Sequence, residues 1–211
     1  MNKYITEFVG TFFLVFAIGM TAHSGSSLTP VVIGSMLMVM VYMGGHISGA
    51  HYNPAVTIGI LIRGKIEAKD VVPYIIAQIA GALAASAAVY WLLGKSFGPA
   101  PGADVGTWQA LGAEMLLTFA LVLVVLNVAT AKKTEGNSYY GLAIGFTVTA
   151  GAATVGGISG GAFNPAVGTG PLLMQTIVGE GSLGNLWMYW VGPVVGALVA
   201  ALVFKLQCPD E

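Results

Sequence analysis

The chain carries the same ordered set of sequence patterns twice, once in each half. The segment Gly45–Val56 reads GHISGAHYNPAV, and the segment Gly156–Val167 reads GGISGGAFNPAV. Two further pairs keep the same order and similar spacing: EFVGTFFLVF at Glu7–Phe16 with EMLLTFALVL at Glu114–Leu123, and AGALA at Ala80–Ala84 with VGALV at Val195–Val199. Chance similarity between apolar segments explains shared Leu and Ala, but not a shared Gly-Ser-Asn-Pro pattern. The sequence therefore contains an internal repeat, and this restricts the chain to folds that are built from two equivalent halves.

We expect one domain over residues 1–211, with repeat one at about 1–95 and repeat two at about 107–211. Charged residues make up only 8% of the 211 positions, and hydrophobic residues make up 56%. A soluble domain carries about 25% charged residues. This chain cannot cover a water-exposed surface with so few charges, so we predict an integral membrane protein whose partner is the lipid bilayer.

Other partner and cofactor classes find no support in the composition. The formal net charge of −1 gives no reason to propose a nucleic acid partner. The only cysteine, Cys208, excludes an intrachain disulfide and indicates no redox chemistry. We predict no cofactor and no metal site.

Six segments have the length of a membrane span, which needs about 20 apolar helical residues for a bilayer core of about 30 Å. They are Tyr4–Ala22, Pro30–Gly45, Val71–Leu93, Trp108–Ala131, Tyr139–Val155 and Leu186–Leu206. Two further apolar segments, Ala55–Ile62 and Ala166–Ile177, are too short to cross. We therefore expect an all-α membrane protein with six transmembrane helices.

The basic residues predict the orientation of these spans. With the N-terminus in the cytoplasm, every Lys and Arg except Lys95 falls at a cytoplasmic end: Lys3, Arg63, Lys65, Lys69, Lys132, Lys133 and Lys205. This bias is typical of membrane proteins and predicts that both termini are cytoplasmic. A cleavable signal peptide is the alternative reading of the first segment. Glu7 in its apolar run, and its repeated partner later in the chain, favour a retained span.

Each repeat holds three spans, and an odd number means that the second repeat enters the bilayer inverted. Each short segment begins with the same triplet: Asn53-Pro54-Ala55 and Asn164-Pro165-Ala166. Asn is favoured just before a helix, and Pro at its first position. A helix of about eight or nine residues reaches about 12–14 Å, roughly half the hydrocarbon core. We expect two re-entrant half-helices whose positive N-terminal ends meet at the membrane centre.

The Gly-rich run before each Asn is expected to be extended backbone at membrane depth. Such backbone is tolerated only where it lines a water-filled cavity or is buried in protein. Its carbonyl groups would form a ladder of acceptors along a pore, and the amides of Asn53 and Asn164 would supply donors at the centre. The alternative is that each Asn only caps a helix in a packed core. Two copies in an inverted repeat favour the pore.

Two Asn-Pro-Ala boxes, one in each half, resemble the aquaporin and glycerol-facilitator (major intrinsic protein) family, and the likeness covers the whole chain. The Glu-x-x-x-Thr-Phe pattern of the first and fourth spans, the segment His46–Gly49 and the pair Gly170-Pro171 add to it. The resemblance implies a right-handed six-helix bundle with two re-entrant half-helices, assembled as a homotetramer with one pore per subunit. Short termini and tight loops are typical of a prokaryotic member, so we expect a prokaryotic plasma membrane.

The resemblance also assigns roles to individual residues. It places Asn53 and Asn164 at the pore midpoint. It places backbone carbonyls along the pore wall, from Gly49, Ala50, His51, Gly160, Gly161 and Ala162. It makes Glu7 and Glu114 buried carboxylates that accept backbone N–H groups of the re-entrant loops. A proton relay is the alternative role for these two residues, but it would need further ionisable side chains in line, which the other spans do not offer.

Members of this family place their narrowest constriction at four positions, which correspond here to Ile33, Ala152, Gly161 and Val167. Water-selective relatives typically have an aromatic residue, a His, a small residue and an Arg there, and glycerol-conducting relatives keep the Arg beside aromatic residues. This chain has no aromatic residue, His or Arg at these positions, and Val167 in place of Arg is the largest departure. The filter should be wide and apolar. The half-helix dipoles and the two Asn donors are then left to reject cations.

We therefore predict a passive channel for water and small neutral solutes, such as glycerol-like polyols, urea, ammonia or metalloid hydroxides. One alternative is a water-selective aquaporin, and another is a channel for a larger or anionic solute, which loss of the filter Arg would allow. A secondary transporter also uses inverted repeats and broken helices. It would need titrating side chains at the midplane, where only Glu7 and Glu114 are available. An enzyme is not expected, because no catalytic constellation lies at the centre.

Overall fold

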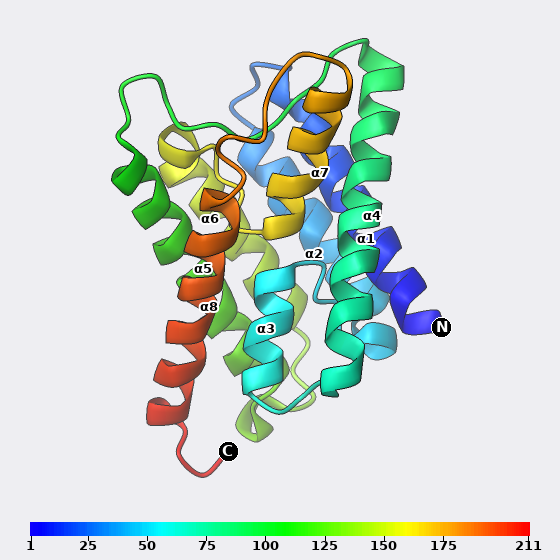
Figure 1. Ribbon diagram of the computed structural model, residues 1–211. Helices are drawn as coiled ribbons and strands as arrows, with labels where there is room; N and C mark the ends of the chain where they lie inside the picture. The colour runs from blue at the N-terminus through cyan, green and yellow to red at the C-terminus, as the bar shows by residue number, and fades with distance from the viewer.

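The computed structural model describes all residues, 1–211, and consists of helices and their connections without strands. In chain order the elements are α1 (Asn2–Ala22), α2 (Thr29–Ser48), α3 (Pro54–Ile62), α4 (Ala68–Leu93), α5 (Thr107–Ala129), η1 (Lys132–Thr134), α6 (Tyr140–Ser159), α7 (Pro165–Ile177) and α8 (Met188–Gln207). All of the α-helices except α3 and α7 are long and apolar enough to cross a membrane. The short α3 and α7 run in opposite directions from the middle of the molecule (Figure 1). The prediction of six spans and two half-helices is confirmed.

Two of the predicted spans end too early. Helices α2 and α6 continue past the predicted ends at Gly45 and Val155 to Ser48 and Ser159, so only the segments Gly49–Tyr52 and Gly160–Phe163 are non-helical before each Asn. Each helix ends where a glycine takes a left-handed backbone, Gly49 with φ 86° and Gly160 with φ 88°. The N–H of each of these glycines donates to the carbonyl oxygen four residues earlier, which caps the last turn of the helix.

Only one of the two half-helices differs in length from the prediction. Helix α3 has nine residues, as expected, but α7 has 13. At 1.5 Å per residue, α7 is about 20 Å long, which is more than half the hydrocarbon core.

Equivalent helices of the two repeats pack in equivalent pairs, α1 on α4 and α5 on α8. The repeated glycines explain how these pairs come close. A Cβ on Gly81 of α4 would overlap the carbonyl oxygen of Phe8 in α1, and a Cβ on Gly196 of α8 would overlap that of Met115 in α5. Small residues allow this kind of close backbone approach between membrane helices. The repeated AGALA and VGALV patterns therefore mark one close crossing in each repeat.

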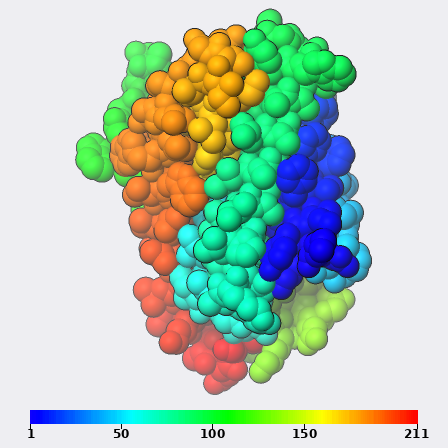
Figure 2. All heavy atoms as spheres, turned by 45° about the vertical axis from the view of Figure 1, so that its right-hand side comes forward, coloured from blue at the N-terminus to red at the C-terminus, as the bar shows by residue number.

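Each half-helix packs into the opposite repeat. Helix α3 contacts α8 and α5 of the second repeat, whereas α7 contacts α4 of the first. In the space-filling view of Figure 2, α4 lies between α1 and α7 on a continuous face of the molecule. Neither repeat buries its half-helix without the other, and the segments before α3 and α7 meet in the middle of the bundle.

Candidate pore

The two Asn residues of the repeated boxes are joined through each other's loops. Asn53 Nδ2 donates to the carbonyl oxygen of Phe163 over 2.8 Å, and Asn164 Nδ2 donates to the carbonyl oxygen of Tyr52 over 2.8 Å. Each Asn also caps its own half-helix, because its Oδ1 accepts the N–H two residues later, over 2.8 and 2.9 Å. These bonds fix both amides and leave each with one N–H that is not committed to the protein.

The rest of each box forms the first turn of a half-helix. Pro54, Ala55, Pro165 and Ala166 are all buried. Both Asn residues have an N-cap φ of −157°, so the two caps share one geometry. A helix N-terminus carries about half a positive elementary charge. Two such ends therefore face the same point in the molecule.

Glu7 and Glu114 are fully buried beside the loops that precede the two boxes. Each accepts one serine hydroxyl and two consecutive backbone N–H groups at 2.6–3.0 Å: Ser48, His51 and Tyr52 for Glu7, and Ser159, Ala162 and Phe163 for Glu114. Hydrogen bonds to a charged acceptor are stronger than those between neutral groups. The two carboxylates therefore hold the shape of the loops.

The direction of these N–H groups determines where the loop carbonyls point. In a trans peptide, the C=O of one residue points opposite to the N–H of the next. The N–H groups that follow Ala50 and His51 point at Glu7, so the carbonyls of Ala50 and His51 point away from it. In the second repeat, the N–H groups that follow Gly161 and Ala162 point at Glu114, so the carbonyls of Gly161 and Ala162 point away from this carboxylate.

Three residues of these loops hold a left-handed backbone that is unfavourable for a side chain. Ala50, Tyr52 and Phe163 have φ of 51°, 50° and 51°. Such conformations cost about 1–3 kcal/mol each and persist where the surroundings over-determine them. The buried carboxylates and the Asn amides are those surroundings here.

Two adjoining cavities run along the loops. The cavity away from the chain termini has a volume of about 230 Å³ and is lined by both Asn residues; it is called the external cavity, after the orientation expected from the basic residues. The cavity nearer the termini has a volume of about 810 Å³ and is called the cytoplasmic cavity for the same reason. Both are lined by Ala50, Val125 and Ile144, so they meet at these residues. Of the residues predicted to present carbonyls, Gly49 lines the cytoplasmic cavity, Ala50 lines both, and the external cavity is lined by His51, Gly160, Gly161 and Ala162.

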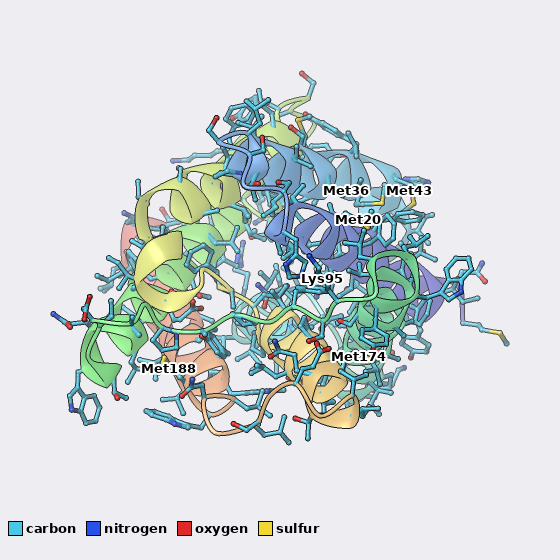
Figure 3. All side chains as sticks on the ribbon, turned by 90° about the horizontal axis from the view of Figure 1, so that it is seen from above. Met20, Met36, Met43, Lys95, Met174 and Met188 are labelled. Carbon is cyan, nitrogen blue, oxygen red and sulfur yellow. The ribbon has the colours of Figure 1, made fainter.

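The four positions predicted for the constriction all line the external cavity: Ile33, Ala152, Gly161 and Val167. Val167 is buried in the first turn of α7. No Asp, Glu, Lys or Arg is among the residues that line this cavity. Lys95 is exposed and does not line the cavity. Figure 3, seen from above, places Lys95 inward of the end of α4, toward the centre of the external face.

Sequence reasoning missed the wall that faces the carbonyls. It is largely aliphatic and comes from α1, α2, α5 and α6: Leu14, Ile18, Leu37, Leu121 and Val148. Phe97, Gly98 and Pro99 of the α4–α5 loop complete it. Aliphatic residues at helical spacing look the same whether they face lipid, core or a cavity, so no pattern could single out this wall.

Two hydroxyl groups that support the loops were also missed, although the repeat carries their signal. Tyr74 Oη donates to the carbonyl oxygen of Ser48 over 2.8 Å, and Tyr189 Oη donates to that of Ser159 over 2.7 Å. Each Tyr lies seven residues before the repeated glycine of its helix. Extending the comparison of the two halves toward the N-terminus would have found this pair.

The first repeat has an additional polar network. Gln78 Nε2 donates to Glu7 Oε2 over 2.8 Å and to Thr57 Oγ1 over 3.0 Å. The ring of His51 lies with Nδ1 at 3.1 Å from the same hydroxyl oxygen. Position for position after Tyr189, the second repeat has Pro193 where the first has Gln78. Glu7 therefore receives one more donor than its counterpart.

Known proteins resemble this chain over nearly its whole length. The family model described as Major intrinsic protein matches residues 1–204. Aquaporin NIP1-3 of Oryza sativa subsp. japonica is 41% identical over 97% of this chain and 73% of its own length. Glycerol uptake facilitator protein-like 6 of Lactiplantibacillus plantarum is 39% identical over 100% of both chains. The X-ray structure of the aquaglyceroporin from Plasmodium falciparum matches with a TM-score of 0.89 and 26% identity, over 99% of this chain and 97% of that one.

Proposed function

Since this chain belongs to the major intrinsic protein family, we propose that it is a passive pore whose wide, apolar external filter admits small neutral solutes together with water. It is an integral membrane channel for water and small neutral solutes such as glycerol, and not an enzyme. One observation carries the finer proposal. The external cavity has no charged side chain in its wall, while backbone carbonyls and two Asn amides line the same space.

This wall suits a solute that is polar but uncharged. Such a solute can exchange hydrogen bonds with water for bonds to the carbonyls of Gly161 and Ala162, and to the free N–H groups of Asn53 and Asn164. An ion would lose its hydration without meeting an opposite charge, and this costs far more free energy than the desolvation of an uncharged polar solute. Glycerol-like polyols, urea, ammonia and metalloid hydroxides are the solutes that we propose.

Rejection of cations rests on the centre of the pore rather than on the filter. At Val167 the family's filter Arg is absent, so no fixed positive charge lines the external cavity. The N-terminal ends of α3 and α7 and the fixed Asn amides remain. Converging positive helix ends form an electrostatic barrier to cations and protons.

We also propose that Glu7 and Glu114 are structural rather than proton-carrying. Neither residue lines either of the two cavities, and both are occupied by hydrogen-bond donors of their own loops. Gln78 and Thr57, which extend the network around Glu7, do not titrate. They separate its carboxylate from the ring of His51, the one titratable side chain at the far end of this network. This arrangement supports passive flux rather than coupled transport.

Stopped-flow light scattering on proteoliposomes tests the proposal, with gradients of water, glycerol, urea and ammonia and with protein-free liposomes as the control. We expect downhill flux that does not saturate with solute concentration. Flux of water without any of the solutes would make the protein a water-selective channel. Uphill accumulation driven by an ion gradient would instead indicate a secondary transporter.

We further propose a homotetramer with one pore per subunit, in a prokaryotic plasma membrane with both termini in the cytoplasm. Both termini lie toward the same end of the molecule (Figure 1), and the basic residues except Lys95 belong to that end by sequence. Trp91 and Trp108, 82% and 79% exposed at the external ends of α4 and α5, suit the opposite interface. Native mass spectrometry in detergent should give the mass of four chains.

A further inference from the structure

The loop between α4 and α5 crosses the external face instead of extending into solvent. It runs from the end of α4 to the beginning of α5 over the middle of the molecule in both views (Figures 1 and 3). Phe97 and Pro99 of this loop are buried, and with Gly98 they line the external cavity. The loop is therefore part of the cavity wall.

Phe97 is seated in a notch of the bundle. Its ring lies against Gly19 of α1, where a Cβ would overlap ring atoms Cε1 and Cζ, and Val89 of α4 borders the same space. Ile18 and Ala22 of α1 line the cavity beside it. Phe97 is only 6% exposed. One edge of the Phe97 ring thus fills the notch, and Phe97 also forms part of the cavity wall.

The following residues carry the loop across to the second repeat. A Cβ on Gly98 would lie 2.6 Å from Oε1 of Gln175 in α7. A Cβ on Gly160, the first residue of the second carbonyl loop, would lie 2.6 Å from the backbone nitrogen of Ala100 and 2.9 Å from Cα and Cβ of Pro99. The loop therefore passes from α1 and α4, over the cavity, to the carbonyl loop on the other side.

Hydrogen bonds fix the loop at both of its ends. Before Phe97, the N–H of Ser96 donates to Glu180 Oε2 over 3.1 Å, and Nε2 of His23 lies 2.9 Å from the carbonyl oxygen of Ser96. After it, the N–H of Gly102 donates to the carbonyl oxygen of Ile158 over 3.0 Å. A backbone held on both sides positions the Phe97 ring with little freedom.

We propose that Phe97 is a specificity-determining residue of this channel, supplying from the α4–α5 loop the bulky apolar wall that Ile33, Ala152 and Val167 do not provide. The inference rests on the proposed function, in which solutes pass through the external cavity. A flat ring in this position packs against the carbon side of a polyol while the carbonyls opposite bind its hydroxyl groups. Its size sets how large a solute can pass.

Two variants move this wall in opposite directions. Phe97→Ala removes the ring and should raise the glycerol-to-water permeability ratio several-fold. Gly19→Ala changes no residue of the cavity wall, but its new methyl group displaces the ring from the notch toward the cavity, so the ratio should fall. Gly112→Ala is the matched control, because a Cβ on this helical glycine meets nothing within 4 Å, and its ratio should equal that of the parent.

The measurement is stopped-flow scattering on proteoliposomes, with the melting temperature of each purified variant recorded beside it. Phe97→Leu should give a glycerol-to-water ratio between those of the parent and Phe97→Ala. If Phe97→Ala does not fold, Phe97→Leu and Gly19→Ala together still test the proposal. Folded variants that lower the melting temperature but leave the ratio unchanged would show a purely structural anchor and overturn the proposal. A parent that conducts no glycerol above protein-free liposomes would contradict the proposed function itself, and with it this role of Phe97.

Discussion

Gly34 of α2 and Gly145 of α6 lie back to back, each against the carbonyl oxygen of the other. The two glycines occupy equivalent positions in the two repeats, and α2 and α6 pack against each other across the repeat boundary. A Cβ on either residue would overlap its partner's oxygen. The two repeats can therefore approach this closely only while both positions lack a side chain.

Gly34→Ala and Gly145→Ala should each lower the free energy of unfolding by about 1–3 kcal/mol, the usual cost of overpacking a close contact. Thermal unfolding in detergent measures the effect. Gly112→Ala makes the same chemical change at an open helical site and should be neutral or stabilising by up to about 1 kcal/mol, because alanine favours the helix. Equal melting temperatures for Gly34→Ala and the control would show that the crossing tolerates a methyl group.

Asn164→Asp should raise cation leak through the pore. The carboxylate cannot donate to the carbonyl oxygen of Tyr52, and it places a negative charge at the N-terminus of α7, where the barrier to cations lies. Asn53→Asp makes the equivalent change at Phe163 and should act in the same direction. Sodium flux into proteoliposomes measures the leak. Unchanged flux and ion exclusion in both variants would contradict the placement of these residues at the pore centre.

Glu7→Gln should destabilise the protein by about 2 kcal/mol, because the amide replaces an ionised acceptor of hydrogen bonds. The loss should exceed that of Glu114→Gln, since only Glu7 also accepts from the side chain of Gln78. Thermal unfolding compares the two variants, and the glycerol-to-water ratio of the surviving channels should stay the same. Unaltered stability together with the loss of a proton-coupled flux would support the relay instead.

Val167→Arg should reduce glycerol flux more than water flux. The side chain would start in the first turn of α7 and add bulk, donors and a positive charge to a cavity that has no charged residue. Permeability ratios of the parent, Val167→Arg and Lys95→Ala measure the change, and cation leak should fall with the added charge. An unchanged ratio in Val167→Arg would place the constriction elsewhere, and a large shift in Lys95→Ala would mean that Lys95 supplies the missing charge.

The α4–α5 loop should loosen in acid. Hydrogen bonds from Ser96, first from its side chain and then from its backbone N–H, lower the pKa of Glu180, which lies outside the spans. A lowered pKa in the folded state means that this anchor contributes fully above the ordinary value of about 4.3 and is lost as the pH falls through the lower folded value. The glycerol-to-water ratio should therefore be constant near neutral pH and change only in that acidic range.

Glu180→Gln removes the titrating group, so its ratio at neutral pH should already resemble that of the parent in acid. Because His23 contacts the carbonyl oxygen of the same Ser96, the pH series is repeated in His23→Gln. A change of the ratio near neutral pH that disappears in His23→Gln would assign the response to His23 and contradict the prediction for Glu180.

The repeat explains which parts of this structure could be predicted from sequence. Two kinds of residue have a recognisable local pattern that recurs at the equivalent position of the other repeat: the helix caps Asn53 and Asn164, and the buried acceptors Glu7 and Glu114. A pattern that is weak evidence when it occurs once becomes strong evidence when it occurs at both equivalent positions. The ends of α2 and α6 could not be predicted, because the local sequence offers several glycines and does not mark which one takes the left-handed backbone that ends each helix, Gly49 and Gly160 here. The place of Phe97 depends on a notch formed by two other helices, which a single unrepeated loop cannot reveal.

The exchange of hydrogen bonds at the centre also sets the order in which the protein can be completed. Asn53 and Phe163 are separated by 110 positions, Asn164 and Tyr52 by 112, and α3 packs on α8, which is synthesised long after it. While only the first repeat has been synthesised, α3 has neither its partner helix nor the acceptor for its Asn amide, and lipid offers no substitute. The centre of the pore should therefore assemble late and in one step, after α8 has inserted. Chains whose synthesis is arrested before α8 should remain sensitive to protease cleavage near α3.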